Sequence, residues 1–199
     1  MSSLPALAPG LADPVHDGQH VFRAAMNALA RPGSVHRLEH LPPAPEPLSP
    51  VAAALMLTLA DHETQVWLDP ALAASAEVAA YLRFHTGARL VADAAMAAFA
   101  VVSDPGCLPS LESLSIGTLD YPDRSTTLIV QVGTLDSGAG WQLAGPGVDG
   151  AVRLAVAPLP TDFLVMMARN RALFPRGVDI LLAAPDRIAG LPRTTVVRA

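Results

Sequence analysis

The sequence predicts an α/β domain in which three layers are built around a central mixed sheet. Helix-like and strand-like segments alternate along the 199 residues, which is typical of an α/β arrangement. Some neighbouring strands also resemble hairpins, so part of the sheet is expected to be antiparallel. With 51% hydrophobic residues, the chain has enough apolar material for one core. We therefore expect a single domain over residues 1–199, with residues 1–12 as a loose N-terminal tail.

The first helix is expected to begin at Asp13-Pro14, where a carboxylate precedes a proline, and to stop at Pro32-Gly33. Apolar residues recur at helical spacing within it and predict a core-facing stripe: Val21, Phe22, Ala25, Met26 and Leu29. Residues 35–41 alternate like a strand, and the proline-rich residues 42–50 form an extended surface connector.

A second helix over residues 51–60 is apolar nearly all round and is therefore expected to be buried. Residues 65–68 form a short strand. Asp69-Pro70 repeats the capping signal for a third helix that runs to about Phe84. In the second half we expect strands at 98–103, 126–134 and 178–183, a hairpin of 141–144 with 151–157, and a helix from Thr161-Asp162 to about Ala172.

The composition excludes several kinds of chemistry. All 13 basic residues are arginine, and without lysine the chain cannot form a Schiff base with pyridoxal phosphate or use a P-loop lysine. The last of the six histidines is His85, so the second half cannot supply a Ser-His or Cys-His pair alone. The net charge of -5 gives no general attraction for nucleic acid or an anionic membrane.

We also expect a soluble, cytoplasmic protein. The N-terminal residues lack the basic segment of a secretory signal. The longest apolar runs, 50–60 and 94–102, are shorter than the roughly 20 residues needed to cross a bilayer. The single Cys107 cannot form an internal disulfide.

Gly145 to Gly150 matches the G-x-G-x-x-G pattern of dinucleotide-binding loops. That mechanism requires a helix to follow, whereas residues 151–156 alternate like a strand. The glycines are therefore predicted to form a turn between two strands.

Two histidine pairs, His16 with His20 and His36 with His40, have the spacing of metal ligands on a helix. No HExxH motif, cysteine partner or carboxylate cluster completes either pair, so no metal site is predicted. For Cys107 no partner base can be named, and it is interpreted as a small buried hydrophobic residue.

The C-terminal residues 169–199 hold six arginines and two acids, a local excess of four positive charges. Arginine binds carboxylates and phosphates through paired hydrogen bonds, so this region is a candidate for an anion or an acidic partner. The alternative is that these arginines cover apolar surface and pair with nearby aspartates.

Five groups of segments, taken in order, resemble the H-subunit family (PhnH) of the bacterial carbon–phosphorus lyase system for phosphonate catabolism. They are Val21-Phe22-Arg23 through Ala30-Arg31-Pro32-Gly33; Leu57-Thr58-Leu59-Ala60-Asp61 with Val66-Trp67; Leu82-Arg83-Phe84-His85-Thr86; Leu143-Ala144-Gly145-Pro146-Gly147; and Leu173-Phe174-Pro175-Arg176-Gly177-Val178-Asp179 with Leu191-Pro192-Arg193-Thr194-Thr195. The resemblance covers nearly the whole chain, from about Asp13 to Val197.

The resemblance implies a fold similar to the large domain of pyridoxal phosphate-dependent transferases, without the cofactor site. It also implies a homodimer that joins the G, I and J subunits in a core complex. That system couples methylphosphonate to the ribose of ATP and displaces adenine, giving alpha-D-ribose 1-methylphosphonate 5-triphosphate. A radical iron–sulfur subunit later cleaves the carbon–phosphorus bond, which one cysteine could not support in this chain.

No catalytic, cofactor-binding or metal residue is carried over from the family. Arg31, Arg83, His85 and Arg193 are the candidate contacts for a partner or an anion, with structural pairing to Asp61 or Asp179 as the alternative. The aromatic motif residues are expected to be large apolar anchors: Phe22, Trp67, Phe84 and Phe174.

Three functions remain open at this point. The chain is an assembly subunit that positions partners, an independent transferase or hydrolase acting on a phosphorylated nucleoside, or a module that binds a small ligand through its C-terminal arginines. The missing lysine and the lack of a nucleophile–base pair disfavour the second.

Overall fold

A computed structural model describes residues 7–150 and 152–199. The α-helices are α1 (His16–Ala30), α2 (Pro50–Leu59), α3 (Pro70–Ala74), α4 (Ala76–Thr86) and α5 (Phe163–Ala172). The strands are β1 (His36–Arg37), β2 (Gln65–Leu68), β3 (Arg89–Val91), β4 (Phe99–Val102), β5 (Thr127–Gln131), β6 (Thr134–Ala144), β7 (Val152–Ala157), β8 (Asp179–Ala184), β9 (Arg187–Leu191) and β10 (Val196–Arg198). Short 3-10 helices are η1 (Ala94–Met96), η2 (Pro105–Cys107), η3 (Leu111–Ser113) and η4 (Pro122–Arg124).

The central sheet has seven strands in the order β1-β9-β8-β5-β4-β2-β3. From β8 to β3 the neighbours are parallel, whereas β9 and β1 add to it in antiparallel fashion. A separate antiparallel sheet has the order β10-β6-β7. The predicted α/β class with a mixed central sheet is confirmed.

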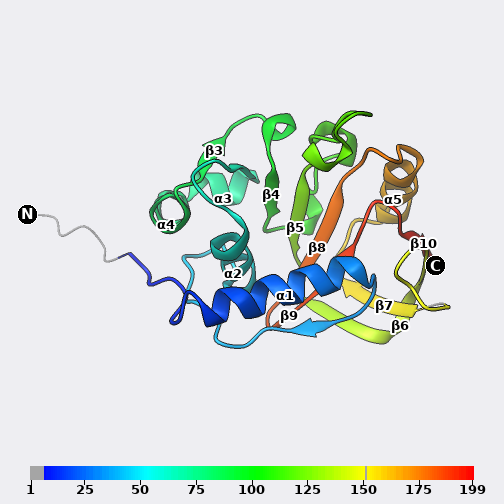
Figure 1. The fold of residues 1–199 in the computed structure, drawn as a ribbon, viewed down its shortest axis with the longest axis horizontal. Coiled ribbons are helices and arrows are strands. Elements are labelled where there is room, and N and C mark those ends of the chain that lie inside the picture. Colours follow the sequence, from blue (N-terminus) through cyan, green and yellow to red (C-terminus); the bar gives the residue numbers. More distant parts are fainter. Residues whose placement is uncertain (1–6, 151) are drawn as a thin grey trace, which may run out of the picture.

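Two apolar clusters cover the two faces of the central sheet and make three layers. Strand β8 shows the division, because Leu181 and Ala183 pack with α1, α2 and α4, whereas Ile180 and Leu182 pack with α5 and the small sheet. This alternation follows from the two-residue period of a strand. In Figure 1, α1 and α2 lie in front of the sheet, and α5 with β10 lies at the end opposite α4 and β3.

Helix α1 confirms the predicted helix, but its buried face differs from the predicted stripe. Val21, Ala24, Ala25 and Ala28 are buried, whereas Phe22 and Met26 are about half exposed. Gly190 of β9 explains which face of α1 is buried. A Cβ at this position would lie only 2.5 Å from the Ala28 carbonyl oxygen, so the helix can approach the strand this closely only because the residue is glycine. The helix therefore approaches the sheet closely at Ala28, and two of its bulky apolar side chains, Phe22 and Met26, turn outward.

The helix predicted from residue 70 to about 84 is two helices joined at Ser75. The Ser75 backbone ends α3, and its hydroxyl accepts a hydrogen bond from the Val78 N–H at the start of α4. The predicted caps at Ser49 and Asp69 are confirmed, since their side chains accept from the Ala52 and Leu72 N–H groups.

The strands differ from prediction at several places. The strand expected over 35–41 is only His36–Arg37, because its partner β9 begins at Arg187, directly after the turn from β8. The segment 126–134 leaves the large sheet after Gln131 and enters the small sheet at Thr134. Strand β3 was not predicted, because three residues are too few to show a period.

A loose tail was expected for residues 1–12. Residues 1–6 lie outside the described residues, and residues 7–12 do not form a loose tail. Ala8 and Leu11 pack against the core. The His85 ring nitrogen Nε2 lies 2.9 Å from the Ala8 carbonyl oxygen. Among the described residues, no helix combines the length and apolarity needed to span a membrane.

Candidate interaction surface

Three of the five motif groups meet at one end of the molecule. Gly147, in the turn between β6 and β7, lies so close to the Ala30 carbonyl at the end of α1 that a Cβ would overlap it. Gly145 in the same turn lies against the backbone of Thr194. The glycine-rich segment is thus a strand–turn–strand, as predicted, and its glycines permit close backbone contacts.

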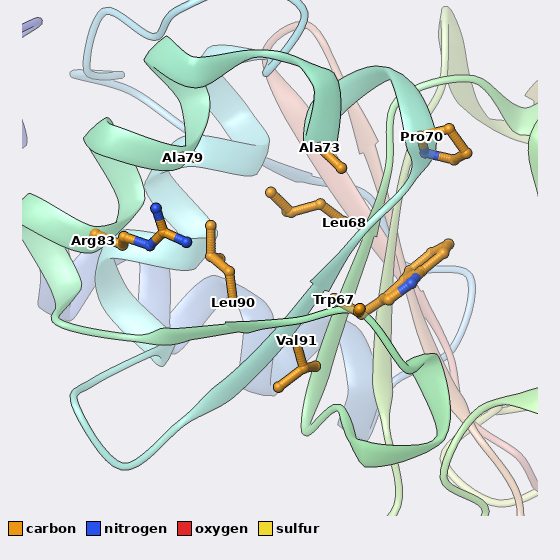
Figure 2. Close-up of a pocket in the computed structure, with 9 residues that line it drawn as sticks. Trp67, Leu68, Pro70, Ala73, Ala79, Arg83, Leu90 and Val91 are labelled. Carbon is orange, nitrogen blue, oxygen red and sulfur yellow. The ribbon is translucent and has the colours of Figure 1, made fainter.

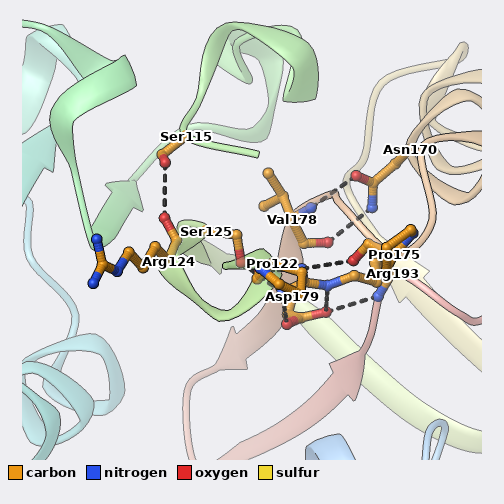
Figure 3. A network of polar contacts seen from close by, with 9 residues as sticks. All are labelled: Ser115, Pro122, Arg124, Ser125, Asn170, Pro175, Val178, Asp179 and Arg193. Atoms are coloured by element: carbon orange, nitrogen blue, oxygen red, sulfur yellow. Dashed lines mark hydrogen bonds and ion pairs between the residues drawn. The ribbon is translucent and has the colours of Figure 1, made fainter. Parts of the chain in front are cut away.

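The fifth motif group is joined internally by the guanidinium of Arg193 (Figure 3). Its Nε and Nη2 donate to the Asp179 carboxylate at 3.1 and 2.6 Å. Nη1 donates to the carbonyl oxygens of Pro122 and Pro175 at 2.7 and 3.3 Å, and Nη2 donates to the Ser125 hydroxyl at 2.5 Å. All five N–H groups are used, so this side chain holds three loops together.

A second clamp fixes the same region from the side of α5. The buried Asn170 amide donates to the Val178 carbonyl and accepts from the Val178 N–H, each at 2.8 Å (Figure 3). Gly177 makes room for it, because a Cβ there would lie 2.9 Å from the Asn170 Oδ1. The chain between α5 and β8 is therefore rigidly positioned.

Phe174 projects from this rigid region and is 63% exposed. Beside it lies an open apolar hollow of about 400 Å³, lined by Pro122, Asp123, Phe174, Pro175, Asp179, Pro192, Arg193 and Thr194. We call Phe174 and this hollow the Phe174 platform. A rigid, exposed aromatic side chain beside an apolar depression is typical of a protein-binding surface.

The expected apolar anchoring by the aromatic motif residues is wrong for three of the four. Phe22 is 50% and Phe84 is 74% exposed, like Phe174, and only Trp67 packs against a core cluster. Sequence periodicity could not predict this exposure, because it shows where apolar side chains occur but not which other parts of the chain pack against them. Three of the five phenylalanines of the chain therefore lie at the surface, and all three fall in the motif segments.

The four candidate contact residues do not form one site. Arg193 is bound within the chain to Asp179, which is the structural alternative considered for it. His85 holds the N-terminal segment and packs edge-on against Tyr81 and Phe84, with ring centroids 4.6 and 5.0 Å apart. Arg31 is exposed at the end of α1.

Arg31 affects the neighbouring His36. Burial, together with the positive charge of Arg31, lowers the pKa of the His36 imidazole below its usual range. The His36 ring Nε2 lies 2.8 Å from the Ser34 hydroxyl. The ring is therefore expected to be neutral at pH 7, so it adds no positive charge beside Arg31.

The C-terminal arginines divide into those that lie in ion pairs and those that do not. Arg187 pairs with Asp186 at 2.7 Å and lies 3.6 Å from Asp136, and Arg193 pairs with Asp179. Four others lie in no ion pair with described residues: Arg169, Arg171, Arg176 and Arg198. Of these four, Arg169 lines a hollow that includes none of the other three.

The carboxyl ends of the parallel strands are where ligands commonly bind in open α/β sheets, at the point where strand order reverses. Here that point lies between β2 and β4, and the buried Asp69 occupies it. Its Oδ2 accepts from the Ser103 N–H and hydroxyl at 2.7 and 2.8 Å. Asp69 was predicted as a helix cap, but its link to β4 was not, because sequence gives no partner for a lone carboxylate.

Two hollows flank Asp69 at this edge. One of about 610 Å³ lies beyond β4, β5 and β8 and includes Asp104 but no arginine or histidine among its lining residues. A phosphate-bearing ligand lacks a cationic partner there. The other, of about 420 Å³, lies beyond β2 and β3 and includes Arg83.

The described residues contain no group of three His, Cys, Asp or Glu side chains that could hold a metal ion. Cys107 is exposed, so the buried position expected for it is wrong. Its thiol lies 3.7 Å from the Asp104 carboxylate, whose charge raises the pKa of the thiol. A raised pKa opposes use of Cys107 as a nucleophile.

Comparison with known proteins gives a consistent result. The family model described as "Bacterial phosphonate metabolism protein (PhnH)" matches residues 9–198. A protein of Rhizobium meliloti (strain 1021) is 42% identical over 184 residues, 92% of each chain, and is named alpha-D-ribose 1-methylphosphonate 5-triphosphate synthase subunit PhnH. A Stutzerimonas stutzeri protein named "Putative C-P lyase subunit protein HtxG" is 31% identical over 80 residues, 40% of this chain and 41% of the relative.

Proposed function

Because this chain belongs to the PhnH family of bacterial phosphonate metabolism proteins, we propose that it serves as a structural subunit of the carbon–phosphorus lyase core complex. In this role it supports synthesis of alpha-D-ribose 1-methylphosphonate 5-triphosphate from ATP and methylphosphonate. The relative that covers 92% of the chain carries the name of that synthase subunit, which supports the assignment.

The Phe174 platform is the observation that carries the structural role. Arg193 and Asn170 fix the loops around Phe174, so binding there costs little conformational entropy. Aromatic side chains held in this way often supply most of the binding energy of an interface. The platform is therefore the surface that meets another subunit.

We assign the G, I and J subunits as partners, a homodimer as the form of the isolated chain, and the cytoplasm as its location. Arg31 and Arg83 remain candidate contacts, since neither lies in an ion pair with described residues. Size-exclusion chromatography with light scattering tests the dimer, and a monomer at micromolar concentration would contradict it.

The fold is that of the large domain of pyridoxal phosphate-dependent transferases without its cofactor site, and the whole chain acts as one domain. The lack of lysine supports the loss of the cofactor, since no aldimine can form on this chain. Titration with pyridoxal phosphate is expected to show no specific absorbance change. A saturable complex of one cofactor per chain would contradict this.

The alternative is a small-ligand module or an independent transferase. A triphosphate requires several converging cations. None of the three hollows described above has more than one arginine among its lining residues, and in one of them that arginine is the fully bound Arg193. These observations favour the assembly role.

Co-purification of the tagged chain with the other subunits from phosphate-starved cells tests the proposal. Phe174→Ala is expected to reduce the recovered G, I and J subunits by about tenfold or more, the effect of losing an interface hot spot. Met96→Ala is the matched control, because Met96 is similarly exposed and lies outside the platform. Equal recovery with both variants would contradict the role assigned to the platform.

A further inference from the structure

The hollow between β3 and helices α3 and α4 is not explained by the Phe174 platform. It lies at the opposite end of the molecule and contains residues of the two remaining motif groups, Trp67 and Arg83 (Figure 1). Its other lining residues are apolar: Leu68, Pro70, Ala73, Ala79, Leu90, Val91 and Ala92. Figure 2 shows Arg83 reaching from α4 toward Leu90 across this hollow.

Strand β3 borders the hollow and is the last strand of the seven-stranded sheet. Its pairing with β2 is parallel, and the Arg89 N–H donates to the Thr64 carbonyl oxygen at 2.9 Å. Because alternate residues of a strand direct their backbone groups to opposite sides, the N–H and C=O of Leu90 point away from β2. No described strand lies there to receive them.

Two arginines lie at this edge, since Arg83 lines the hollow and Arg89 is the first residue of β3. Arg83 and Arg89 are both exposed, and neither lies in an ion pair with the carboxylates that the structure describes. A second copy of the chain paired at this edge would bring two more arginines to the same place. Like charges across a strand pair are destabilising, so an acidic partner is favoured over a second copy.

We propose that the β3 edge binds an extended acidic segment of a partner protein as an added strand. The backbone of the segment forms hydrogen bonds with the N–H and C=O of Leu90. One apolar side chain enters the hollow between Trp67 and Arg83, and a carboxylate two residues along, on the same face of the strand, pairs with Arg83. The proposal goes beyond the assembly role assigned to Phe174, because it names a different surface and the chemistry of its partner.

A direct test uses the isolated protein and a synthetic peptide, acetyl-Thr-Leu-Thr-Asp-Val-Glu-amide, which places leucine and aspartate on one face. Titration followed by ¹H–¹⁵N NMR is expected to shift the Leu90 amide and the Trp67 indole N–H at millimolar peptide. The same peptide with both acids replaced by lysine is expected to leave them unshifted.

Variants locate the site without disturbing the core. Ala73 is exposed and lines the hollow, so Ala73→Trp fills the hollow and is expected to abolish the shifts. Ala74 is exposed in the same helix but does not line the hollow, so Ala74→Trp is the matched control with unchanged binding. Arg83→Glu is expected to weaken binding by about tenfold or more, the effect of losing a charge-assisted pair.

Absent shifts at Leu90 and Trp67 would overturn the proposal, as would equal binding of the lysine peptide or of the Ala73→Trp variant. The experiment needs no other subunit. Its failure would therefore leave the role of Phe174 in assembly untouched, and failure of the Phe174 experiment would leave this site untouched.

Discussion

The guanidinium of Arg193 binds the carboxylate of Asp179 through two donor atoms, at 3.1 and 2.6 Å, and joins the start of β8 to the segment after β9. The remaining donors of Arg193 reach Pro122, Pro175 and Ser125. One side chain therefore determines the shape of the surface from which Phe174 projects.

Arg193→Ala is expected to lower the free energy of unfolding by about 2–4 kcal/mol, because it removes the guanidinium that pairs with the partly buried Asp179 and donates to two carbonyls, although the backbone N–H of residue 193 still donates to Asp179. Arg193→Lys is expected to recover little, since an ammonium group cannot reproduce the planar set of five donors. Urea unfolding measures both. Arg171→Ala, an exposed change outside any described ion pair, should stay within about 0.5 kcal/mol of the wild type. A similarly small effect of Arg193→Ala would show that the network does not stabilise the fold.

Asp69→Asn is expected to destabilise the protein by about 2–3 kcal/mol. If the amide nitrogen of asparagine replaced Oδ2, it would face the N–H and hydroxyl donors of Ser103. If the amide were flipped, the nitrogen would face the Leu72 N–H, so in both orientations a donor would meet a donor. Thermal unfolding should show a lower Tm than that of Asp104→Asn, because Asp104 is not buried. Equal Tm values would contradict the role of Asp69 in joining β2 to β4.

Gly190→Ala is expected to destabilise the protein by about 1–3 kcal/mol, since a Cβ would press on the Ala28 backbone and move α1 from the sheet. Gly18→Ala is the control, because a Cβ there has its nearest neighbour at 3.9 Å. Chemical denaturation compares the two. Unchanged stability of Gly190→Ala would show that close packing does not decide which face of α1 is buried.

His36 gives a pH dependence with a definite sign. Its pKa is lowered in the folded state, so the folded protein binds fewer protons than the unfolded chain as the pH falls below about 6.5. The contribution of His36 to stability is thus present above the unfolded pKa and is lost as the pH falls through the folded value. NMR titration of the ring is expected to show a higher pKa in Arg31→Ala. An unchanged value would leave burial as the only cause.

Cys107 is expected to react with iodoacetamide at pH 8 more slowly than a free cysteine, because the charge of Asp104 raises the pKa of its thiol. Asp104→Asn should increase the rate, and the difference should shrink as the pH is raised and both thiols ionise. A faster reaction of the wild type than of Asp104→Asn would contradict this influence.

Local signals in the sequence predicted much of the fold. Ser49 and Asp69 mark helix starts because capping depends on neighbouring residues, and Gly145 to Gly150 could be identified as a turn because of the alternation after it. The buried face of α1 could not be predicted, since it depends on Gly190, more than 150 residues later in the chain.

The sequence predicted only part of the candidate interaction surface. The motif segments that contain Phe174 and Arg193 were identified, and Asp179 was considered as a partner of Arg193. The exposure of Phe174 was not foreseen, because an aromatic residue among prolines has the same pattern whether it is buried or exposed. Strand β3 and the hollow beside it depend on contacts between separate helices and strands and left no periodic signal.

Turnover of ATP with methylphosphonate by reconstituted subunits tests the central claim most directly. The account predicts that this chain alone has no activity, that the G, I and J subunits lose activity when it is omitted, and that adding it back restores both the complex and its turnover. Formation of the ribose methylphosphonate triphosphate by the purified chain alone would contradict a structural role.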